Sequence, residues 1–500
     1  MRAFMTSAKT PKIRVLMLTA EAHPLVKVGG LGDYAGSLPK AFNFVIDSSL
    51  SEIDLRVIMP FHNEISLPEA GIRKCCDVSV PRKGGAAHGC VYETQHENVR
   101  YYLVKRKGKP SGYDAVYNPD PKDDARKFIF FSLASLFFLR EIGWQPHIIH
   151  ANDWHTAAAV KQLEALKEED EFFNQMKSVQ VVHNLPFLGE GSQSELKAYG
   201  IRPAQSRLLP DWAISLPFPM GLEAADQIVA VSPSYADELM DEEFSDGLAP
   251  FFKANKNKVT GILNGIDIEI WDPASDPKIN KNFSAENMDG RYLNKIYILD
   301  KAKFNTSGNH PLLILISRLT FQKGMDIVLQ GLPLVLDKPW NAIILGRGQA
   351  EYETGFSELE EAYPDRIKFF PEYNDQLAHQ LYAAGDIFLM PSLYEPCGLS
   401  QMIAMRYGCV PIARAVGGLK DSIQSNDPHH KDGYLFKEAD AFSFSGAITE
   451  ALKDYENKMM WGAIQARGMR KDFSWQSSAK KYLGLYSLLS GINLEGFPFS

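Results

Sequence analysis

Residues 14–33 read RVLMLTAEAHPLVKVGGLGD, and this stretch decides the class of fold. It begins with an apolar run at residues 14–18, turns near Pro24 and reaches a glycine-rich segment that leads into a helical pattern. A continuous apolar run is typical of a parallel strand that is buried on both faces. The order of buried strand, turn and helix therefore predicts a doubly wound α/β domain.

The same order recurs through the first half of the chain. Its predicted strands are short apolar runs followed by polar or glycine residues, and they lie at residues 15–19, 55–59, 148–150, 179–183 and 228–231. Residues 80–104 differ, because they alternate in polarity and contain a glycine pair, and this pattern predicts a small β excursion.

The second half restarts the pattern and predicts a second doubly wound unit. Its predicted strands lie at residues 312–317, 342–345, 367–370, 387–390 and 410–413. We place the linker near residues 265–276, which gives domains at 1–272 and 273–476. A helix at 477–489 begins a last segment, 477–500, which we expect to pack back on the first domain. Two such sheets facing each other would form a ligand cleft at the carboxyl ends of their strands.

Composition supports this organisation and excludes several classes of function. The chain has 500 residues, which is too long for one ordinary core, and its 45% hydrophobic and 23% charged residues are typical of a globular protein. The net charge is -8 and no long Lys/Arg run occurs, so we expect no nucleic-acid partner.

The cysteines and the first residues indicate the compartment. Five scattered cysteines form no CxxC pair, so neither a disulfide scaffold nor a metal site is expected, and a reducing cytoplasm fits best. Residues 1–11 are too polar for a signal peptide, and the run at 14–18 is too short to span a bilayer. We therefore expect a cytoplasmic protein with no membrane contact.

The glycine-rich segment, residues 27–33, is the first candidate site. Gly29 and Gly30 would let a ligand approach the backbone, the following helix would offer free N–H groups, and Lys27 would add a cation. The alternative is an ordinary glycine-rich turn between a strand and a helix, since short glycine motifs are weak signals.

Two further candidates follow predicted strands of the first half. Asp153 and His155 could bond to sugar hydroxyls, although Asp153 could equally serve only as a helix N-cap and Trp154 only as core. His183 could donate to a sugar hydroxyl, and Asn184 lies beside it. The alternatives are a structural histidine and a turn residue.

The next candidates lie at the linker and in the second half. Asn264 begins an Asn-Gly turn signal, for which a hinge is favoured over direct chemistry. Arg318 and Lys323 leave the same predicted strand end, and together they could neutralise a departing diphosphate without a metal. The alternative is a pair of solvated surface cations.

Residues 394–400, YEPCGLS, are the richest candidate. Pro396 stands where a helix would start, so the N–H groups of residues 397–399 would point at a ligand, and Glu395 could accept bonds from sugar hydroxyls. The alternative is a helix cap with a structural carboxylate. A nucleophilic role for Cys397 would need a base nearby, and none is visible locally, so we interpret it as a contact residue.

Taken in order, these segments resemble one family. The segments are KVGGLGD (27–33), DWHT (153–156), VHN (182–184), LNGID with WDP (263–267 and 271–273), SRLTFQKG (317–324), LGRG (345–348) and EPCGLSQ (395–401). Over roughly residues 13–490 the chain is similar to bacterial-type glycogen synthases and plant starch synthases. The resemblance implies the two-Rossmann GT-B fold and glucose transfer, usually from ADP-glucose, to the non-reducing end of an α-1,4-glucan with retention.

The resemblance also implies roles for individual residues. The donor diphosphate would contact Lys27 and Gly30 in the first half of the chain. In the second half, Arg318 and Lys323 would bind it. The transferred glucose and the acceptor would contact Asp153 and His183, while Tyr373 would stack on the nucleotide base. The implied catalytic residues are Lys27, Asp153, His183, Arg318, Lys323 and Glu395. The implied substrate-binding residues are Gly29, Gly30, Asp33, His155, Asn184, Asn264, Gly346, Tyr373, Cys397, Gly398, Leu399 and Ser400.

The implied partners are ADP-glucose and an α-glucan, with no cofactor and no metal, and the oligomeric state stays open. The chain departs from the family at Val28, where Thr is usual, at Gly32, where Ala is usual, and at Pro186-Phe187. Ile403 occupies the place of a second glutamate found in the broader retaining group. A UDP-glucose-dependent transferase and an inactive glucan-binding homologue are the alternatives. A phosphorylase would need a pyridoxal phosphate lysine.

Overall fold

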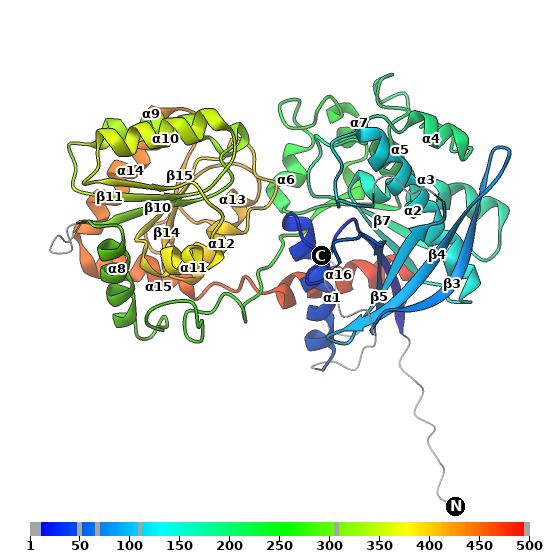
Figure 1. The fold of residues 1–500 in the computed structure, drawn as a ribbon, viewed down its shortest axis with the longest axis horizontal. Coiled ribbons are helices and arrows are strands. Elements are labelled where there is room, and N and C mark those ends of the chain that lie inside the picture. Colours follow the sequence, from blue (N-terminus) through cyan, green and yellow to red (C-terminus); the bar gives the residue numbers. More distant parts are fainter. Residues whose placement is uncertain (1–11, 48–52, 66–70, 109–112, 305–309, 495–500) are drawn as a thin grey trace, which may run out of the picture. The chain divides into compact units, whose positions relative to one another are not determined.

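The computed structural model describes residues 12–47, 53–65, 71–108, 113–304 and 310–494. The chain forms two compact units, residues 1–265 with 475–500 and residues 266–474 (Figure 1). The expectations for residues 1–11 and for 495–500 fall outside the described residues. Each unit is built on a largely parallel sheet, so the predicted pair of Rossmann-like domains is confirmed.

In its described residues, the first unit contains one nine-stranded sheet in the order β3-β4-β5-β2-β1-β6-β7-β8-β9. The strands are β1 (Ile13–Leu18), β2 (Ile53–Pro60), β3 (Arg73–Arg82), β4 (Gly85–His96), β5 (Val99–Arg106), β6 (Ile148–Asn152), β7 (Lys177–Val182), β8 (Gln227–Ala230) and β9 (Val259–Gly261). All pairings are parallel except those of β4 with β3 and β5. The antiparallel ribbon is the predicted β excursion.

Helices cover this sheet, and the last of them comes from the C-terminal end of the chain. They are α1 (Gly30–Asp47), α2 (Pro121–Glu141), α3 (Trp154–Glu169), α4 (Gln193–Ala198), α5 (Pro217–Ala224), α6 (Pro233–Glu238), α7 (Ala249–Ala254) and α16 (Trp475–Ser490), with a 3₁₀ turn at Lys256–Lys258. The last helix packs against α1, where the Tyr34 hydroxyl donates to Tyr482 at 2.9 Å. Tyr486 bonds to His150 of β6 at 2.8 Å, so α16 completes the first unit.

The second unit contains, among its described residues, a six-stranded sheet in the order β12-β11-β10-β13-β14-β15, parallel throughout. The strands are β10 (Leu312–Ile316), β11 (Asn341–Leu345), β12 (Ile367–Phe370), β13 (Ile387–Met390), β14 (Val410–Arg414) and β15 (Tyr434–Phe436). The helices are α8 (Asp289–Lys301), α9 (Met325–Gly331), α10 (Ala350–Ala362), α11 (Asp375–Ala384), α12 (Ser400–Arg406), α13 (Gly417–Ser422), α14 (Ala441–Glu456) and α15 (Lys458–Met469), with 3₁₀ turns at Phe321–Lys323 and Leu332–Val335.

Alternate residues of each central strand face opposite layers of helices, as in a doubly wound fold. Leu313 and Leu315 of β10 join a core cluster with Trp340 and with Phe444 of α14, all nearly fully buried. In Figure 1, α9 and α10 lie on one side of this sheet, and α11 and α12 lie on the other.

The chain enters the second unit at Ile266, earlier than the expected boundary at 272, and leaves it at Ser474. At this point Ile266 forms a parallel bridge with Ser474, and its N–H donates to Phe473 at 2.8 Å. The early boundary follows from Trp271, whose ring stacks on that of His379 with 4.0 Å between centroids. Residues 266–272 therefore fold with the second unit.

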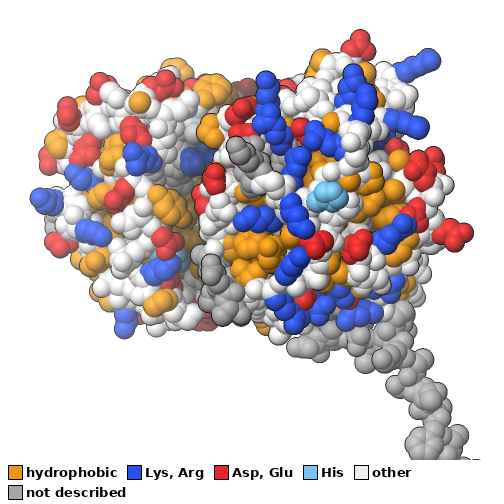
Figure 2. All heavy atoms as spheres, turned by 45° about the vertical axis from the view of Figure 1, so that its right-hand side comes forward, with side chains coloured by type: hydrophobic (Ala, Val, Ile, Leu, Met, Phe, Trp, Pro, Cys, Tyr) orange, Lys and Arg blue, Asp and Glu red, His pale blue; other side chains and the backbone are white. Residues whose placement is uncertain are grey.

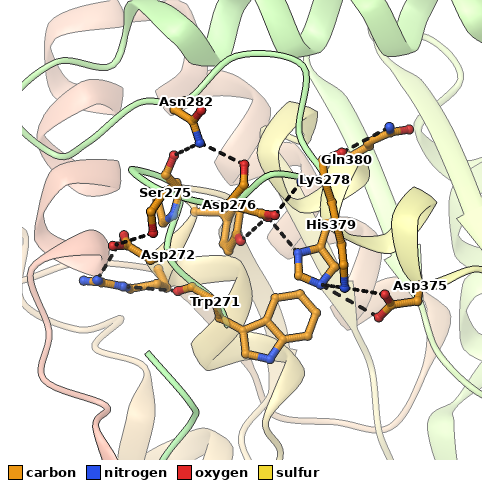
Figure 3. A network of polar contacts seen from close by, with 12 residues as sticks. Trp271, Asp272, Ser275, Asp276, Lys278, Asn282, Asp375, His379 and Gln380 are labelled. Carbon is orange, nitrogen blue, oxygen red and sulfur yellow. Dashed lines mark hydrogen bonds and ion pairs between the residues drawn. The ribbon is translucent and has the colours of Figure 1, made fainter. Parts of the chain in front are cut away.

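A buried polar network fixes the segment that follows (Figure 3). Asp276 is fully enclosed and accepts a 2.7 Å bond from His379 and a 2.6 Å bond from Tyr407. Lys278 donates to Asp375 at 2.5 Å and lies 3.3 Å from the His379 ring. These bonds tie the entering chain to α11, so the segment is an integral part of the unit.

Figure 2 shows acidic and basic side chains interspersed on the face that it presents. Within the described ranges, every helix is too short or too polar to cross a membrane. The cytoplasmic localisation and the absence of a nucleic-acid partner stay predictions.

Candidate active site

Neighbouring parallel strands bring the predicted site residues of the first unit to one sheet edge. Leu18 of β1 pairs with Ala151 of β6, and Asn152 pairs with Val181 of β7. The carboxyl ends of parallel strands lie at the same edge of a sheet. The residues that follow these three strands therefore approach one another.

Asp153 is the most unusual residue at this edge. It is 7% exposed, and its backbone angles (φ 53°, ψ −170°) lie where a non-glycine residue is strained by about 1–3 kcal/mol. Asp153 stands at the N-cap of α3, as the alternative proposed, but its carboxylate accepts the N–H of His183 at 2.7 Å and makes no bond to that helix. Burial raises the pKa of Asp153 to about 7.

His183 is held as a neutral imidazole. Burial lowers its pKa to about 3, and its ring meets the Tyr34 ring edge-on at 4.5 Å. Nε2 lies 2.9 Å from the side-chain oxygen of Asn152, whose amide nitrogen already donates to Leu18. Because that oxygen can only accept, we assign the proton to Nε2, which leaves Nδ1 as an acceptor.

Three predicted substrate-binding residues carry a buried polar atom without a partner in the described part of the chain. They are His155 (Nδ1), Asn184 (Oδ1) and Asn264 (Oδ1). Each such atom costs about 1–3 kcal/mol, and the described residues contain eleven more of them, so these three do not by themselves mark a site. They fit positions whose partner arrives with a ligand or with water. The His155 ring packs on Trp154 at 4.4 Å and Phe128 at 4.6 Å, and burial lowers its pKa well below the usual value.

The glycine-rich segment leaves its backbone accessible. Lys27 is exposed and its Nζ lies 2.7 Å from Asp33. A Cβ added at Gly30 would meet no atom within 4 Å, and one added at Gly29 would make only an ordinary contact. The packing of the described residues therefore does not require glycine at position 30, where α1 begins. The open backbone matches the predicted approach of a ligand.

Glu21, between β1 and this segment, is a residue that the sequence analysis missed. It is 1% exposed, and its carboxylate accepts the N–H groups of Val28 and of Gly29 and the hydroxyl of Tyr117. Burial raises its pKa. The available signal was a carboxylate just after an apolar strand, the same placement that pointed to Asp153.

In the second unit, Lys323 and Glu395 form a close ion pair. They follow β10 and β13, which are neighbours in the sheet, and Nζ of Lys323 lies 2.5 Å from Oε2 of Glu395. Ser392 also donates to Oε2, at 3.0 Å. Both bonds use the same oxygen, so Oε1 of Glu395 is left for another donor.

Of the remaining predicted residues at this edge, two have exposed side chains and one is a glycine that packing requires. Arg318 is exposed and makes no ion pair within the described part of the chain, and the Tyr373 ring is 88% exposed. Gly346 has a packing reason, because a Cβ there would overlap the carbonyl oxygen of Ser317.

The segment before α12 differs from its prediction. The helix begins at Ser400, so the expectation that Pro396 opens it is wrong. Gly398 has φ 71°, which is incompatible with a helix, and the Gln401 amide donates to the Cys397 carbonyl at 3.1 Å. The N–H groups of residues 397–399 therefore belong to a turn. Leu399 stands at the N-cap position, and Ser400 hydrogen-bonds to Tyr382 of α11.

The structure thus assembles the predicted residues in small groups. Asp153 contacts His183, and the other direct pairs are Lys27 with Asp33 and Lys323 with Glu395. A search of the described residues finds no group of three or more His, Cys, Asp or Glu side chains that could hold a metal ion.

Comparisons with known proteins identify the family. Residues 14–254 match the family described as the starch synthase catalytic domain, and residues 298–467 match the glycosyl transferases group 1. The glycogen synthase of Clostridium perfringens (strain 13 / Type A) is 35% identical over 487 residues, which cover 95% of this chain and 98% of that protein. The glycogen synthase of Bacillus licheniformis is 35% identical over 488 residues, with the same coverage.

A solved structure extends the likeness to the fold. The catalytic domain of starch synthase IV from Arabidopsis thaliana, bound to ADP and acarbose, superposes with a TM-score of 0.84 at 28% identity, covering 96% of this chain and 100% of that chain. The two parallel sheets and these matches define a glycosyltransferase with the GT-B fold. Within that class, the chain belongs to the glycogen synthase and starch synthase family.

Proposed function

We propose that the protein transfers glucose from ADP-glucose to the non-reducing end of an α-1,4-glucan with retention. The observation that carries this proposal is the Lys323–Glu395 pair, with an exposed Arg318 after the same strand as Lys323, on a chain that belongs to the glycogen synthase and starch synthase family. The starch synthase structure bound to ADP supports an adenine nucleotide as the leaving group.

The second unit would supply positive charges that stabilise the leaving group. As the bond from the anomeric carbon to the phosphate oxygen breaks, negative charge grows on the diphosphate, and Arg318 and Lys323 stabilise it. Lys323 would then be shared between the diphosphate and Glu395. Lys323 and Ser392 both bond to Oε2 of Glu395. Its Oε1 would therefore accept a hydrogen bond from a hydroxyl of the transferred glucose.

The first unit would supply acceptors and donors for hydroxyl groups. His183 stays neutral through the physiological pH range and offers Nδ1 as an acceptor. The glucan 4-hydroxyl forms the new bond to the anomeric carbon on the face that the diphosphate leaves, and its proton passes to a diphosphate oxygen. No step in this scheme uses a metal or a cofactor, because the two protein cations balance the charge of the leaving group.

A donor comparison tests the proposal. Purified protein is incubated with glycogen and either ADP-glucose or UDP-glucose, and the released nucleotide is quantified by chromatography. We expect faster release of ADP, with transferred glucose that a hydrolase specific for α-1,4 links removes. Faster release of UDP would overturn the donor assignment, and glycogen binding without any nucleotide release would indicate an inactive homologue.

A further inference from the structure

Glu21 is a buried carboxylate whose partners are all hydrogen-bond donors. Its Oε2 accepts the N–H of Val28 and, at 3.1 Å, the N–H of Gly29, while its Oε1 accepts the hydroxyl of Tyr117 at 2.9 Å. An ionised carboxylate has no proton to donate, so it can only accept hydrogen bonds. The three donors therefore match the ionised group and offset part of the cost of burying it.

These bonds hold the inner side of the glycine-rich loop. The Val28 side chain is exposed and the space beside Gly30 is open, whereas the N–H groups of Val28 and Gly29 turn inward to the carboxylate. The loop therefore presents one free side, which carries Lys27, and one side that Glu21 fixes.

The other main-chain bonds of this loop, among the described residues, leave the N–H groups of Val28 and Gly29 to the carboxylate. Ala22 and Val26 exchange two main-chain bonds of 3.1 Å, and the N–H of Gly32 donates to Gly29 at 3.1 Å. Neither contact reaches the N–H of Val28. The middle of the loop is therefore held by the carboxylate.

Tyr117, the third donor, is anchored to a different part of the unit. The buried Lys127 of α2 donates to the carbonyl of Val116 at 2.7 Å, and Asp124 of the same helix accepts the N–H of Asn118 at 3.1 Å. The carboxylate consequently connects the loop to α2 as well as to the end of β1.

We propose that Glu21 is a positioning residue for glucosyl transfer, which holds the backbone of residues 27–30 in the shape that receives the donor diphosphate. The inference rests on the proposed function for the nature of the ligand. The holding of the loop by Glu21 can be measured without any donor, so the two can fail separately.

The charge of Glu21 also acts on the neighbouring catalytic candidate. Burial is the larger cause of the raised pKa of Asp153, and the negative charge of Glu21 raises it further. Neutralising Glu21 should therefore lower the pKa of Asp153 and move the acid limb of activity to lower pH.

The test uses two substitutions with different chemistry. Glu21→Ala removes all three bonds, and we expect kcat to fall about 100-fold with an unchanged KM for glycogen. Glu21→Gln can still accept both N–H groups with its oxygen and donate to Tyr117 with its amide. We expect it to recover kcat to within about tenfold of the wild type and to show the shifted acid limb.

Glu223 provides a matched control. Its Oε1 accepts two main-chain N–H groups, from Gln205 at 2.7 Å and Ser206 at 2.6 Å, and its other oxygen pairs with Lys161 at 2.8 Å. Glu223→Ala therefore removes two main-chain bonds of the same kind, together with an ion pair, from a loop with no predicted ligand contact. We expect its kcat and donor KM to stay within about twofold of the wild type.

Hydrogen exchange reports the loop directly, whatever the donor. Amides of residues 27–30 should exchange at least tenfold faster in Glu21→Ala than in the wild type, and at the wild-type rate in Glu223→Ala. If Glu21→Ala does not fold, Glu21→Asp takes its place, because its shorter side chain withdraws the carboxylate from the N–H groups of Val28 and Gly29. Unchanged loop exchange in these variants would overturn the inference.

A double substitution separates positioning from general damage. If Glu21 acts through the loop that carries Lys27, then Glu21→Gln should cost much less activity in a Lys27→Ala background than in the wild type. Losses that simply multiply would overturn the positioning role. A wild-type protein that releases no nucleotide would defeat the proposed function alone, since the exchange experiment would still decide the role of Glu21.

Discussion

The two sheet edges of this protein manage charge in opposite ways. In the first unit, Asp153 and His183 are buried with no ion pair among the described residues, and burial raises the pKa of Asp153 and lowers that of His183, which favours the neutral form of each. In the second unit, Lys323 and Glu395 keep opposite charges in contact, and Arg318, which follows the same strand as Lys323, is exposed.

The difference teaches what each edge is suited to bind. A buried group without a counter-ion loses hydration and favours neutrality, which suits hydrogen bonds to sugar hydroxyls. Paired and exposed cations keep their charge, which suits a diphosphate. The proposed reaction needs both, because a neutral acceptor attacks a sugar whose leaving group is an anion.

Removing a cation from the second unit should have the largest effect. We expect Lys323→Ala to lower kcat with ADP-glucose by about 1,000-fold, because a transition-state charge loses its partner. Lys338→Ala is the control, since Lys338 pairs with Asp337 before β11 and lies outside the predicted site. Initial-rate assays decide the matter. A Lys323→Ala variant with more than a tenth of wild-type turnover would contradict the comparison.

Closing the open backbone of the first unit should have the next largest effect. Gly30→Ala should lower kcat about 100-fold while stability is unchanged, since its Cβ meets no atom of the described residues. Gly346→Ala should instead lower the free energy of unfolding by about 1–3 kcal/mol, because its Cβ overlaps Ser317. Denaturant titrations and kinetics together separate the two glycines. Equal stability losses would remove the distinction.

The pH dependence tests which protonation state of Asp153 is active. If ionised Asp153 is needed, kcat should fall about tenfold per pH unit below about 7, where Asp153 titrates. The folded pKa lies above the unfolded value of 3.8, so the stability from this group is complete below pH 3.8 and is lost as pH rises through 7.

Asp153→Asn supplies the matching stability measurement. We expect this variant to lack activity but to be at least as stable as the wild type at pH 8 in urea titrations, because a buried charge has been removed. An active variant, or one that unfolds more easily at pH 8, would show that the carboxylate is structural.

The smallest expected effect concerns the base of the donor. Tyr373→Ala should raise the KM for the nucleotide sugar about fivefold with kcat nearly unchanged, because the exposed ring would stack on the base. Tyr373→Phe keeps the stacking face and should match the wild type. A lower kcat with constant KM would place Tyr373 in the chemistry instead.

The sequence predicted most of the fold because apolar runs mark buried strands directly. Residues 387–390 and 410–413 lie in the adjacent strands β13 and β14. Most other predicted runs are also strands in the structure. β9 and β15 were missed because each has only three residues, too few to show a pattern. Local cues therefore suffice for long buried strands and fail for short edge strands.

The site was predictable as a set of strand ends but not as a set of contacts. Asp153 was found by its position, yet its bond to His183 depends on the pairing of β6 with β7. The start of α12 was misplaced because the turn around Gly398 depends on the Gln401 side chain. Glu21 escaped because a lone carboxylate shows no partners until the loop folds over it.

The central claim is that protein cations, rather than a metal, carry the charge of the departing nucleotide in a retaining transfer. The most direct measurement is turnover of chelator-treated protein with ADP-glucose and glycogen, with the anomeric configuration of the new link read by NMR. We predict full turnover and an α link. Loss of activity that a divalent ion restores, or a β link, would contradict the account.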